Sequence, residues 1–200
     1  MTAKADLRRK MRAVIAAIPA QEAERQAEMA AERLAEWPVY RRAGCVLLYA
    51  SLPGELDTAP MLDRALADGK RLLLPRCGAD GEMRAVRVED LRGLCPGRFG
   101  IREPSAALPA EDPQAIDLVL APGLAFDGRG TRLGRGKGFF DRFLLRTRAV
   151  AAGVAYLEQI LPDFPAQARE PHDVWMDFLV TARGVLPARR GCKNEGGGAR

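Results

Sequence analysis

The sequence predicts an α/β fold, in which a mostly parallel sheet carries helices on both faces. Apolar runs of strand length alternate with helical segments along most of the chain, and this order is typical of parallel sheets. The run CVLLYAS at 45–51 is continuously apolar, as expected for a strand that is buried on both sides. A length of 200 residues suits one domain with its own core. We assign residues 1–188 to this domain and 189–200 (RRGCKNEGGGAR) to a disordered, low-complexity tail.

The expected elements follow from hydrophobic periodicity and from the positions of proline and glycine. Residues 3–36 predict two helices, because apolar residues from Leu7 to Ile18 recur at helical spacing and Pro19 interrupts the pattern. A stretch rich in proline and glycine at 91–113 predicts a long connection. The other expected elements are helices from Asp57 or Thr58 to Leu66 and from Phe139 to about Arg148, and strands at 71–75, 83–88, 117–122, 150–156 and, as the last strand, 176–183.

The composition indicates a globular protein of the cytoplasm with a basic surface. The formal net charge of +5 suits anionic partners such as nucleic acid or small phosphates, although an arginine-rich composition gives the same surface without such a partner. No apolar stretch reaches the roughly 18 residues of a membrane span, and the charged N-terminus lacks the apolar segment of a signal peptide. The 4 cysteines are far apart and form no C-x-x-C pair, which favours reduced thiols over a zinc site or disulfides.

The segment 120–145 predicts a strand, a glycine-rich basic loop and a helix. Glycine lets backbone amides approach an anion, and arginine and lysine add charged donors, so the loop is suited to holding phosphate. It is not a Walker A loop, because Lys137 is followed by Gly138 instead of Ser or Thr, and the dinucleotide pattern G-x-G-x-x-G is absent. A flexible, solvated basic loop is the alternative. The glycines are Gly128, Gly130, Gly134, Gly136 and Gly138, and the basic residues are Arg129, Arg132, Arg135, Lys137 and Arg142.

Four carboxylates are candidates for metal or ligand contacts. Asp141 lies in the first turn of the helix after the loop, where it can bind Mg²⁺ beside a phosphate or only interact with the helix dipole. Glu55 can face ligand nitrogen donors or be structural, whereas Asp57 is better explained as a helix cap. Asp177 is next to a strand and could reach the metal. The only histidine, His172, is assigned to loop structure because no catalytic partner for it is evident.

Two further pairs have a functional and a plain structural interpretation. Lys4 and Arg8 are one helical turn apart and share a face, which is either a ligand-facing or a solvated helix edge. Phe139 and Phe140 can stack on a flat ring or pack their helix. The chain has no G-x-S-x-G motif and no recognisable pair of cysteine and histidine, so covalent catalysis is not expected.

Several sequence blocks, in order along the chain, resemble those of the 5-formyltetrahydrofolate cyclo-ligase family, also called methenyltetrahydrofolate synthetases. The block RLGRGKGFFD at 132–141 is the most specific of them. The others are Lys4-x-x-Leu7-Arg8, YASLPGELDT at 49–58, Gly69-Lys70, GIREP at 100–104, PGLAFD at 122–127, and His172-Asp173 to Asp177.

The resemblance implies an enzyme with a three-layer α/β sandwich of Rossmann-like topology. Its implied reaction is the ATP- and Mg²⁺-dependent cyclisation of 5-formyltetrahydrofolate to 5,10-methenyltetrahydrofolate, with release of ADP and phosphate. The formyl oxygen attacks the γ-phosphate in this chemistry, so no protein nucleophile is needed. We expect a monomer that acts on this small molecule, with neither nucleic acid nor a membrane as a partner.

By position, the resemblance also assigns the site residues. ATP would be held by Lys4, Arg8, Arg132, Gly134, Arg135, Gly136, Lys137, Gly138, Phe139 and Phe140. The folate substrate would contact Glu55, Arg135, Gly136, Lys137, Gly138 and Phe139. Lys4, Arg135 and Lys137 would be catalytic, and Asp141 and Asp177 would bind Mg²⁺.

The chain departs from the family pattern at Phe140, where the family commonly has a tyrosine. If that hydroxyl binds substrate, its loss costs on the order of 1 kcal/mol or more. A family member that binds ATP but acts on another substrate, or mainly sequesters folate, is therefore one alternative. An RNA-binding module that uses the basic loop is another, but no aromatic residues interleave with the basic stretch to provide a stacking platform.

Overall fold

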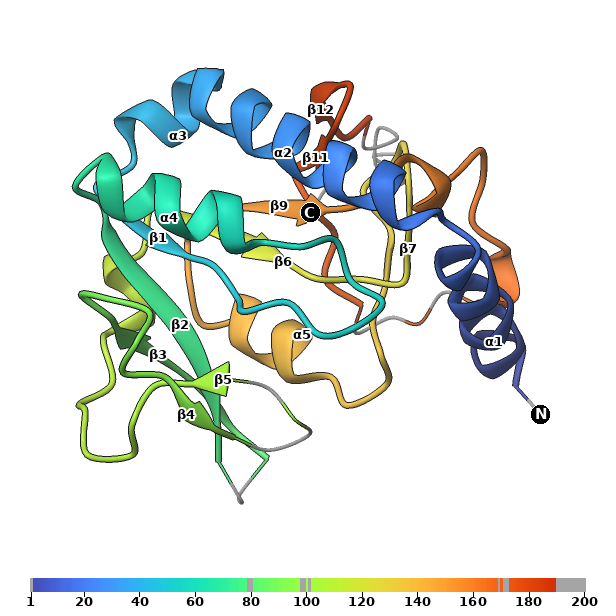
Figure 1. Ribbon diagram of the computed structural model, residues 1–200. Coiled ribbons are helices and arrows are strands. Elements are labelled where there is room, and N and C mark those ends of the chain that lie inside the picture. Colours follow the sequence, from blue (N-terminus) through green and yellow to red (C-terminus); the bar gives the residue numbers. More distant parts are fainter. Residues whose placement is uncertain are drawn as a thin grey trace, which may run out of the picture.

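A seven-stranded sheet forms the centre of the computed structural model, which describes residues 2–78, 81–97, 100, 102–168, 170 and 173–189 (Figure 1). The strand order is β12-β11-β9-β6-β1-β2-β3. The five inner strands are parallel to their neighbours, and only β3 and β12 at the edges are antiparallel. The strands are β1 (Cys45–Leu47), β2 (Arg71–Cys77), β3 (Met83–Arg87), β6 (Leu118–Ala121), β9 (Val150–Val154), β11 (Phe178–Thr181) and β12 (Gly184–Pro187).

Helices cover both faces of this sheet, which confirms the predicted α/β class. Figure 1 shows α2 and α4 on one face and α5 on the other. Neighbouring residues of β1 separate accordingly: Val46 packs in the core cluster that includes α2 and α4, and Leu47 in the cluster that includes Phe143 of α5. The helices are α1 (Ala3–Ala16), α2 (Ala20–Glu36), α3 (Pro38–Arg42), α4 (Ala59–Ala67) and α5 (Phe139–Leu144), with short 3₁₀ turns at Pro113–Ala115, Leu157–Gln159 and Ala166–Ala168.

The strand order creates a switch point between β1 and β6. The parallel strands, numbered in chain order, follow the doubly wound arrangement 2-1-3-4-5. The chain continues from β1 to β2 on one side and from β6 to β9 on the other, so a crevice opens beyond their carboxyl ends. Such crevices bind ligands in open α/β sheets.

The glycine-rich segment is divided into a hairpin and a loop, which differs from the single loop predicted. Residues Ala125–Asp127 (β7) and Arg132–Leu133 (β8) pair as a hairpin, and β10 (Ile160–Leu161) joins them in a three-stranded sheet. The Asp127 carboxylate fixes the turn by accepting hydrogen bonds from the amides of Arg129 and Thr131, both at 2.9 Å. Gly128, Arg129 and Gly130 therefore belong to a structural turn, and the candidate phosphate loop is 134–138.

Two other expectations about elements were wrong in detail. The helix that begins at Phe139 ends at Leu144 rather than near Arg148, because the chain turns at Thr147, whose hydroxyl accepts from the Ala149 amide. The strand at 178–181 is not the last one, because a tight turn leads into β12. After α2 ends at Glu36, Pro38 begins a further short helix, α3. The connection at 91–113 contains a small strand pair, β4 (Cys95–Pro96) with β5 (Arg102–Glu103).

We predict that Gly130→Ala destabilises the fold, because the hairpin turn lies against the chain before β11. Gly130 has a φ of +89°, which L-residues avoid, and an added Cβ would collide with the backbone carbonyl of Met176. A left-handed non-glycine residue alone costs roughly 1–3 kcal/mol, so we expect a loss of at least about 2 kcal/mol in the free energy of unfolding. Urea denaturation measures this. Gly128→Ala is the matched control, since nothing lies within 4 Å of its added Cβ, and equal losses in both variants would contradict the explanation.

In the described part of the chain, no helix combines the length and apolar character that crossing a membrane requires. The cytoplasmic location, the monomeric state and the division into residues 1–188 and a tail at 189–200 stay predictions, and residues 190–200 lie outside the described range.

Candidate active site

Two adjoining cavities lie at the carboxyl ends of β1, β2 and β6. One, of about 330 Å³, is mostly apolar; the other, of about 270 Å³, is lined mainly by charged side chains and glycines. We call them the apolar cavity and the charged cavity. Gly134, Lys137, Gly138 and Asp141 line both cavities. The glycine-rich loop and the first turn of α5 therefore form a shared wall between them. The switch point of the sheet thus carries the predicted loop, as the topology requires.

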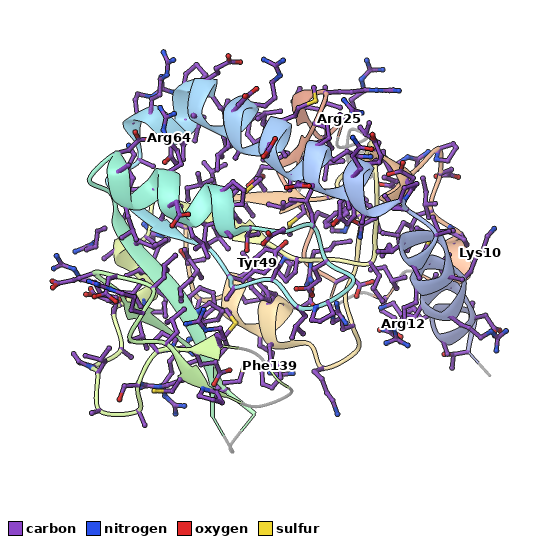
Figure 2. All side chains as sticks on the ribbon, in the orientation of Figure 1. Lys10, Arg12, Arg25, Tyr49, Arg64 and Phe139 are labelled. Atoms are coloured by element: carbon purple, nitrogen blue, oxygen red, sulfur yellow. The ribbon has the colours of Figure 1, made fainter. Side chains whose placement is uncertain are left out.

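The apolar cavity has aromatic rings on one side and strand ends on the other. Tyr49, which follows β1, meets the Phe140 ring edge-on at a centroid distance of 6.4 Å. Figure 2 shows Tyr49 between α4 and α5 and Phe139 at the start of α5. Burial, followed by the nearby Glu55 carboxylate, raises the pKa of Tyr49 well above its ordinary value, so its phenol stays neutral. The lining also includes Ala50, Leu52, Glu55, Pro75, Cys77, Met83, Glu103, Pro122, Arg132 and Arg135.

Glu55 lies in the wall of the apolar cavity and pairs with the glycine-rich loop. Its Oε1 accepts from Arg135 Nε at 2.7 Å, and its Oε2 accepts from the Leu52 amide at 2.9 Å. The loop after β1 and the glycine-rich loop are therefore tied together across the cavity. Asp57, in contrast, bonds locally at the start of α4: its Oδ1 accepts from the Ala59 amide at 3.0 Å, although the N-cap residue is Thr58 and not Asp57 as predicted.

The charged cavity brings the N-terminal helix to the glycine-rich loop. Lys4 Nζ donates to Glu170 at 2.7 Å and to Asp173 at 2.8 Å, while Arg8 Nε donates to the Gly134 carbonyl at 2.9 Å. The face shared by Lys4 and Arg8 is therefore directed at the site, and the solvated-edge interpretation is wrong for it. The lining also includes Gly136, Arg142 and Leu145.

Lys4 is held in its charged form. Burial opposes the charge, but the hydrogen bonds to Asp173 and Glu170 and the charges of these two groups outweigh it and raise the pKa of Lys4. An ammonium with a raised pKa cannot act as a base near neutral pH. Its available role is electrostatic.

Two glycines of the loop have backbone conformations that suit only glycine. Gly136 has a φ of +105° and Gly138 a φ of +67°. An added Cβ at Gly136 would lie 3.4 Å from the guanidinium carbon of Arg8, and one at Gly138 would lie 2.9 Å from Arg142. The loop therefore turns tightly between two cationic side chains, and Gly138 directly precedes α5.

Asp141 and Asp177, the two predicted metal ligands, have different surroundings. Asp141 lines both cavities. Asp177 begins the approach to β11, where its Oδ2 accepts from the Ala151 amide at 2.9 Å and ties the starts of β9 and β11 together. These strand starts are at the edge of the sheet opposite to the carboxyl ends. The carboxylate that shares the charged cavity with Asp141 is Asp173, four residues earlier.

Arg132, which the resemblance assigned to ATP, is buried, although it belongs to the lining of the apolar cavity. Its side chain is 3% exposed, and its guanidinium donates to the Pro122 carbonyl at 3.0 Å and to Asp141 Oδ1 at 2.6 Å. Among the assigned cations it therefore differs from Lys137 and Arg135, which are exposed.

Sequence reasoning missed three acidic residues of the site. Glu170 and Asp173 belong to the acidic segment EPHDVWMD, whose density of carboxylates was the available signal. Glu103 is buried in the wall of the apolar cavity, and its Oε1 accepts from the Cys77 amide at 3.2 Å; it belongs to the block GIREP, which carries the resemblance, but no site role was assigned to it. His172 lies outside the described residues.

The basic charge of the chain is also distributed far from the site. Figure 2 shows Lys10 and Arg12 on α1, Arg25 on α2 and Arg64 on α4, and all four are exposed. The net charge thus does not by itself indicate a nucleic-acid surface.

Comparisons with known proteins agree with the resemblance. Residues 1–182 match the sequence model of the 5-formyltetrahydrofolate cyclo-ligase family. A 5-formyltetrahydrofolate cyclo-ligase of Mycolicibacterium smegmatis is 38% identical over 152 residues, which cover 72% of this chain and 77% of the relative. The NMR structure of the Aquifex aeolicus 5,10-methenyltetrahydrofolate synthetase superposes with a TM-score of 0.83 at 34% identity, covering 94% of each chain. A Mycoplasma pneumoniae 5,10-methenyltetrahydrofolate synthetase, 22% identical, shares the fold with a TM-score of 0.72 over 90% of this chain and 99% of that one.

Proposed function

Because the chain belongs to the 5-formyltetrahydrofolate cyclo-ligase family, we propose that it converts 5-formyltetrahydrofolate and ATP to 5,10-methenyltetrahydrofolate, ADP and phosphate. One observation carries this proposal: an apolar, aromatic cavity and a charged cavity meet at Gly134, Lys137, Gly138 and Asp141. Such a pair of cavities suits a flat ring on one side and a polyphosphate on the other, with the reacting atoms at the shared wall.

The reaction needs two displacements at that wall. The formyl oxygen attacks the γ-phosphorus while the bond to the bridging β,γ-oxygen breaks, and ADP leaves. N10 of the folate then attacks the activated formyl carbon. The carbon–oxygen bond breaks, phosphate leaves with the former formyl oxygen, and the N10 proton is lost to solvent. The protein contributes positioning and charge, as is usual in phosphoryl transfer.

The cations of the charged cavity suit the phosphates. Lys4 keeps its charge and Arg8 lies against the loop, so both can face a polyphosphate bound along 134–138. Lys137 lines both cavities, where it can neutralise the group in transfer. Among the described residues, no three His, Cys, Asp or Glu side chains gather as a metal cluster.

A pair of carboxylates fits Mg²⁺ that arrives with ATP, because nucleotide-bound Mg²⁺ typically takes one or two carboxylates together with phosphate and water. We propose Asp141 and Asp173 as this pair and replace Asp177 by Asp173, since the latter lines the charged cavity. When bound, Mg²⁺ neutralises charge on the phosphates.

The apolar cavity suits the pterin. Glu55 and Glu103 offer carboxylate acceptors for ring N–H groups, and Tyr49, Phe139 and Phe140 offer apolar ring contacts. A cavity of about 330 Å³ is at the small end of the range for small-molecule sites. The p-aminobenzoyl end of the folate would then extend outside it.

The test is the absorbance of methenyltetrahydrofolate during incubation of the purified protein with 5-formyltetrahydrofolate, Mg²⁺ and ATP. We expect a rise that requires ATP, with one ADP formed per product. The absence of Tyr at position 140 favours a second candidate, a family member that binds ATP with a different substrate. ATP binding by calorimetry without any rise in absorbance would overturn the proposed reaction and favour that candidate.

A further inference from the structure

We propose that Arg132 is a positioning residue, which holds the Asp141 carboxylate at the wall between the two cavities, rather than a residue that binds phosphate. This inference deepens the proposed function and rests on it for the role of Asp141. Arg132 is the most deeply buried of the described cations assigned to the site.

The Arg132 guanidinium donates hydrogen bonds to two different segments. Nη1 donates to the carbonyl of Pro122, which directly follows β6, and Nη2 donates to Oδ1 of Asp141 in the first turn of α5. Arg132 itself belongs to β8. One planar group thus connects the end of a central strand, the hairpin and the helix that follows the loop. A forked donor of fixed geometry is suited to setting such a distance.

The ion pair between Arg132 and Asp141 is largely shielded from solvent. The Arg132 side chain is 3% exposed and the Asp141 side chain 18% exposed. Nε is buried with no hydrogen-bond partner in the described structure. A buried N–H without a partner is costly, and a buried ion pair is often no more stable than apolar residues of the same volume. Stability therefore does not explain why an arginine is at this position, whereas fixing the Asp141 carboxylate does.

The Arg132 guanidinium also contacts the aromatic side of the apolar cavity. Its carbon lies 5.9 Å from the centroid of the Phe140 ring, which in turn meets Tyr49 in the apolar cavity. An added Cβ at Gly134 would lie 3.2 Å from Arg132 Nη1. Gly134 thus leaves space for the guanidinium as well as belonging to the loop. Arg132 therefore contacts two wall residues, Asp141 and Gly134, and also the Phe140 ring of the apolar cavity.

The Asp141 carboxylate is held through one of its two oxygens. The hydrogen bonds described for its carboxylate, from Arg132 at 2.6 Å and from the Val174 amide at 3.4 Å, both end on Oδ1. With Oδ1 fixed, the rotation of the carboxylate is fixed, and Oδ2 has a defined direction. A carboxylate oriented in this way binds a cation without first losing side-chain entropy.

The experiment separates metal binding from phosphate binding. In EDTA, ATP or ADP binds through the protein cations alone, and calorimetry gives its affinity. With Mn²⁺ as the probe, electron paramagnetic resonance gives the affinity of the protein–ADP complex for the metal. For Arg132→Met we expect the Mn²⁺ affinity to fall about tenfold or more, as for other groups that orient metal ligands, while the affinity for ADP in EDTA changes less than about twofold. Arg132→Lys keeps the positive charge but loses the forked guanidinium. Its Mn²⁺ affinity should therefore lie between that of the unaltered protein and that of Arg132→Met.

The control is Arg146→Met, since Arg146 pairs with Glu82 on the surface and should change neither affinity. A fall of fivefold or more in ADP affinity in EDTA would make Arg132 a phosphate ligand and overturn the proposal, as would unchanged Mn²⁺ affinity. If Arg132→Met does not fold, as judged by circular dichroism, Arg132→Lys decides by the same two affinities. Neither affinity depends on turnover of 5-formyltetrahydrofolate, so a failure of the proposed reaction is distinguishable from a failure of this inference.

Discussion

Lys137→Ala is expected to lower kcat/KM for ATP-dependent cyclisation by about two to three orders of magnitude. Among the described residues, Lys137 is the only lysine that lines both cavities, where the proposed reaction would transfer the γ-phosphoryl group to the formyl oxygen and then release phosphate. Loss of one donor that stabilises transition-state charge typically costs about 10²- to 10³-fold. The methenyltetrahydrofolate absorbance at saturating Mg²⁺ measures the effect.

The control is Lys10→Ala. Lys10 lies on α1, as Figure 2 shows, and is exposed. The substitution Lys10→Ala removes the same charge from the chain, but Lys10 lines neither cavity. It should therefore turn over at the rate of the unaltered protein. Equal losses in both variants would mean that the net charge, and not the wall, is responsible. Normal kinetics for Lys137→Ala would remove the phosphate-loop argument.

Asp141→Asn should lower kcat by about 10²-fold or more and raise the Mg²⁺ concentration needed for half-maximal rate. The amide keeps the size of the side chain and an acceptor for Arg132 but not the charge that a divalent cation needs. Loss of groups that only orient metal ligands already costs about 10- to 100-fold, so loss of a ligand should cost at least as much. A Mg²⁺ titration at fixed ATP provides both quantities.

Two further variants test whether Asp173 or Asp177 is the second carboxylate that binds Mg²⁺. Asp173→Asn should raise the Mg²⁺ requirement and also loosen Lys4, because Asp173 and Lys4 form an ion pair of 2.8 Å. Asp177→Asn should leave the Mg²⁺ requirement unchanged and affect mainly stability, because Asp177 bonds to the Ala151 amide. The opposite result, a Mg²⁺ effect for Asp177→Asn alone, would restore the original assignment.

The sequence was sufficient for the fold class and for the loop, because both depend on local patterns. Continuously apolar runs identify buried parallel strands, and closely spaced glycines among basic residues identify a backbone that turns tightly between cationic side chains; the binding of phosphate by this loop stays a prediction. It was not sufficient for the hairpin β7–β8, since strands of three and two residues have too few positions to show periodicity.

The carboxylate pair and Arg132 were beyond sequence reasoning for a different reason. Asp173 and Asp177 are both acidic residues in one segment, and only the strand register shows which of them faces the charged cavity. Arg132 has the same side chain as its exposed neighbour Arg135, and only tertiary packing buries one of the two. The chemical type of a side chain can be read from the sequence. Its orientation and burial depend on residues that are far away along the chain.

The ion pair between Lys4 and Asp173 has a consequence for how the protein is made. The two residues are separated by 169 positions, so α1 leaves the ribosome long before its partner is synthesised. Domains fold during synthesis as their segments become available, and β1, β2 and β6 precede Asp173 by more than 50 residues. The central strands β1, β2 and β6 can therefore pair while the charged cavity still lacks a wall and β11 and β12 are not yet made. A nascent chain that ends before residue 170 should bind nucleotide weakly, and the capacity to bind it arises only when α1 meets the segment that contains Asp173.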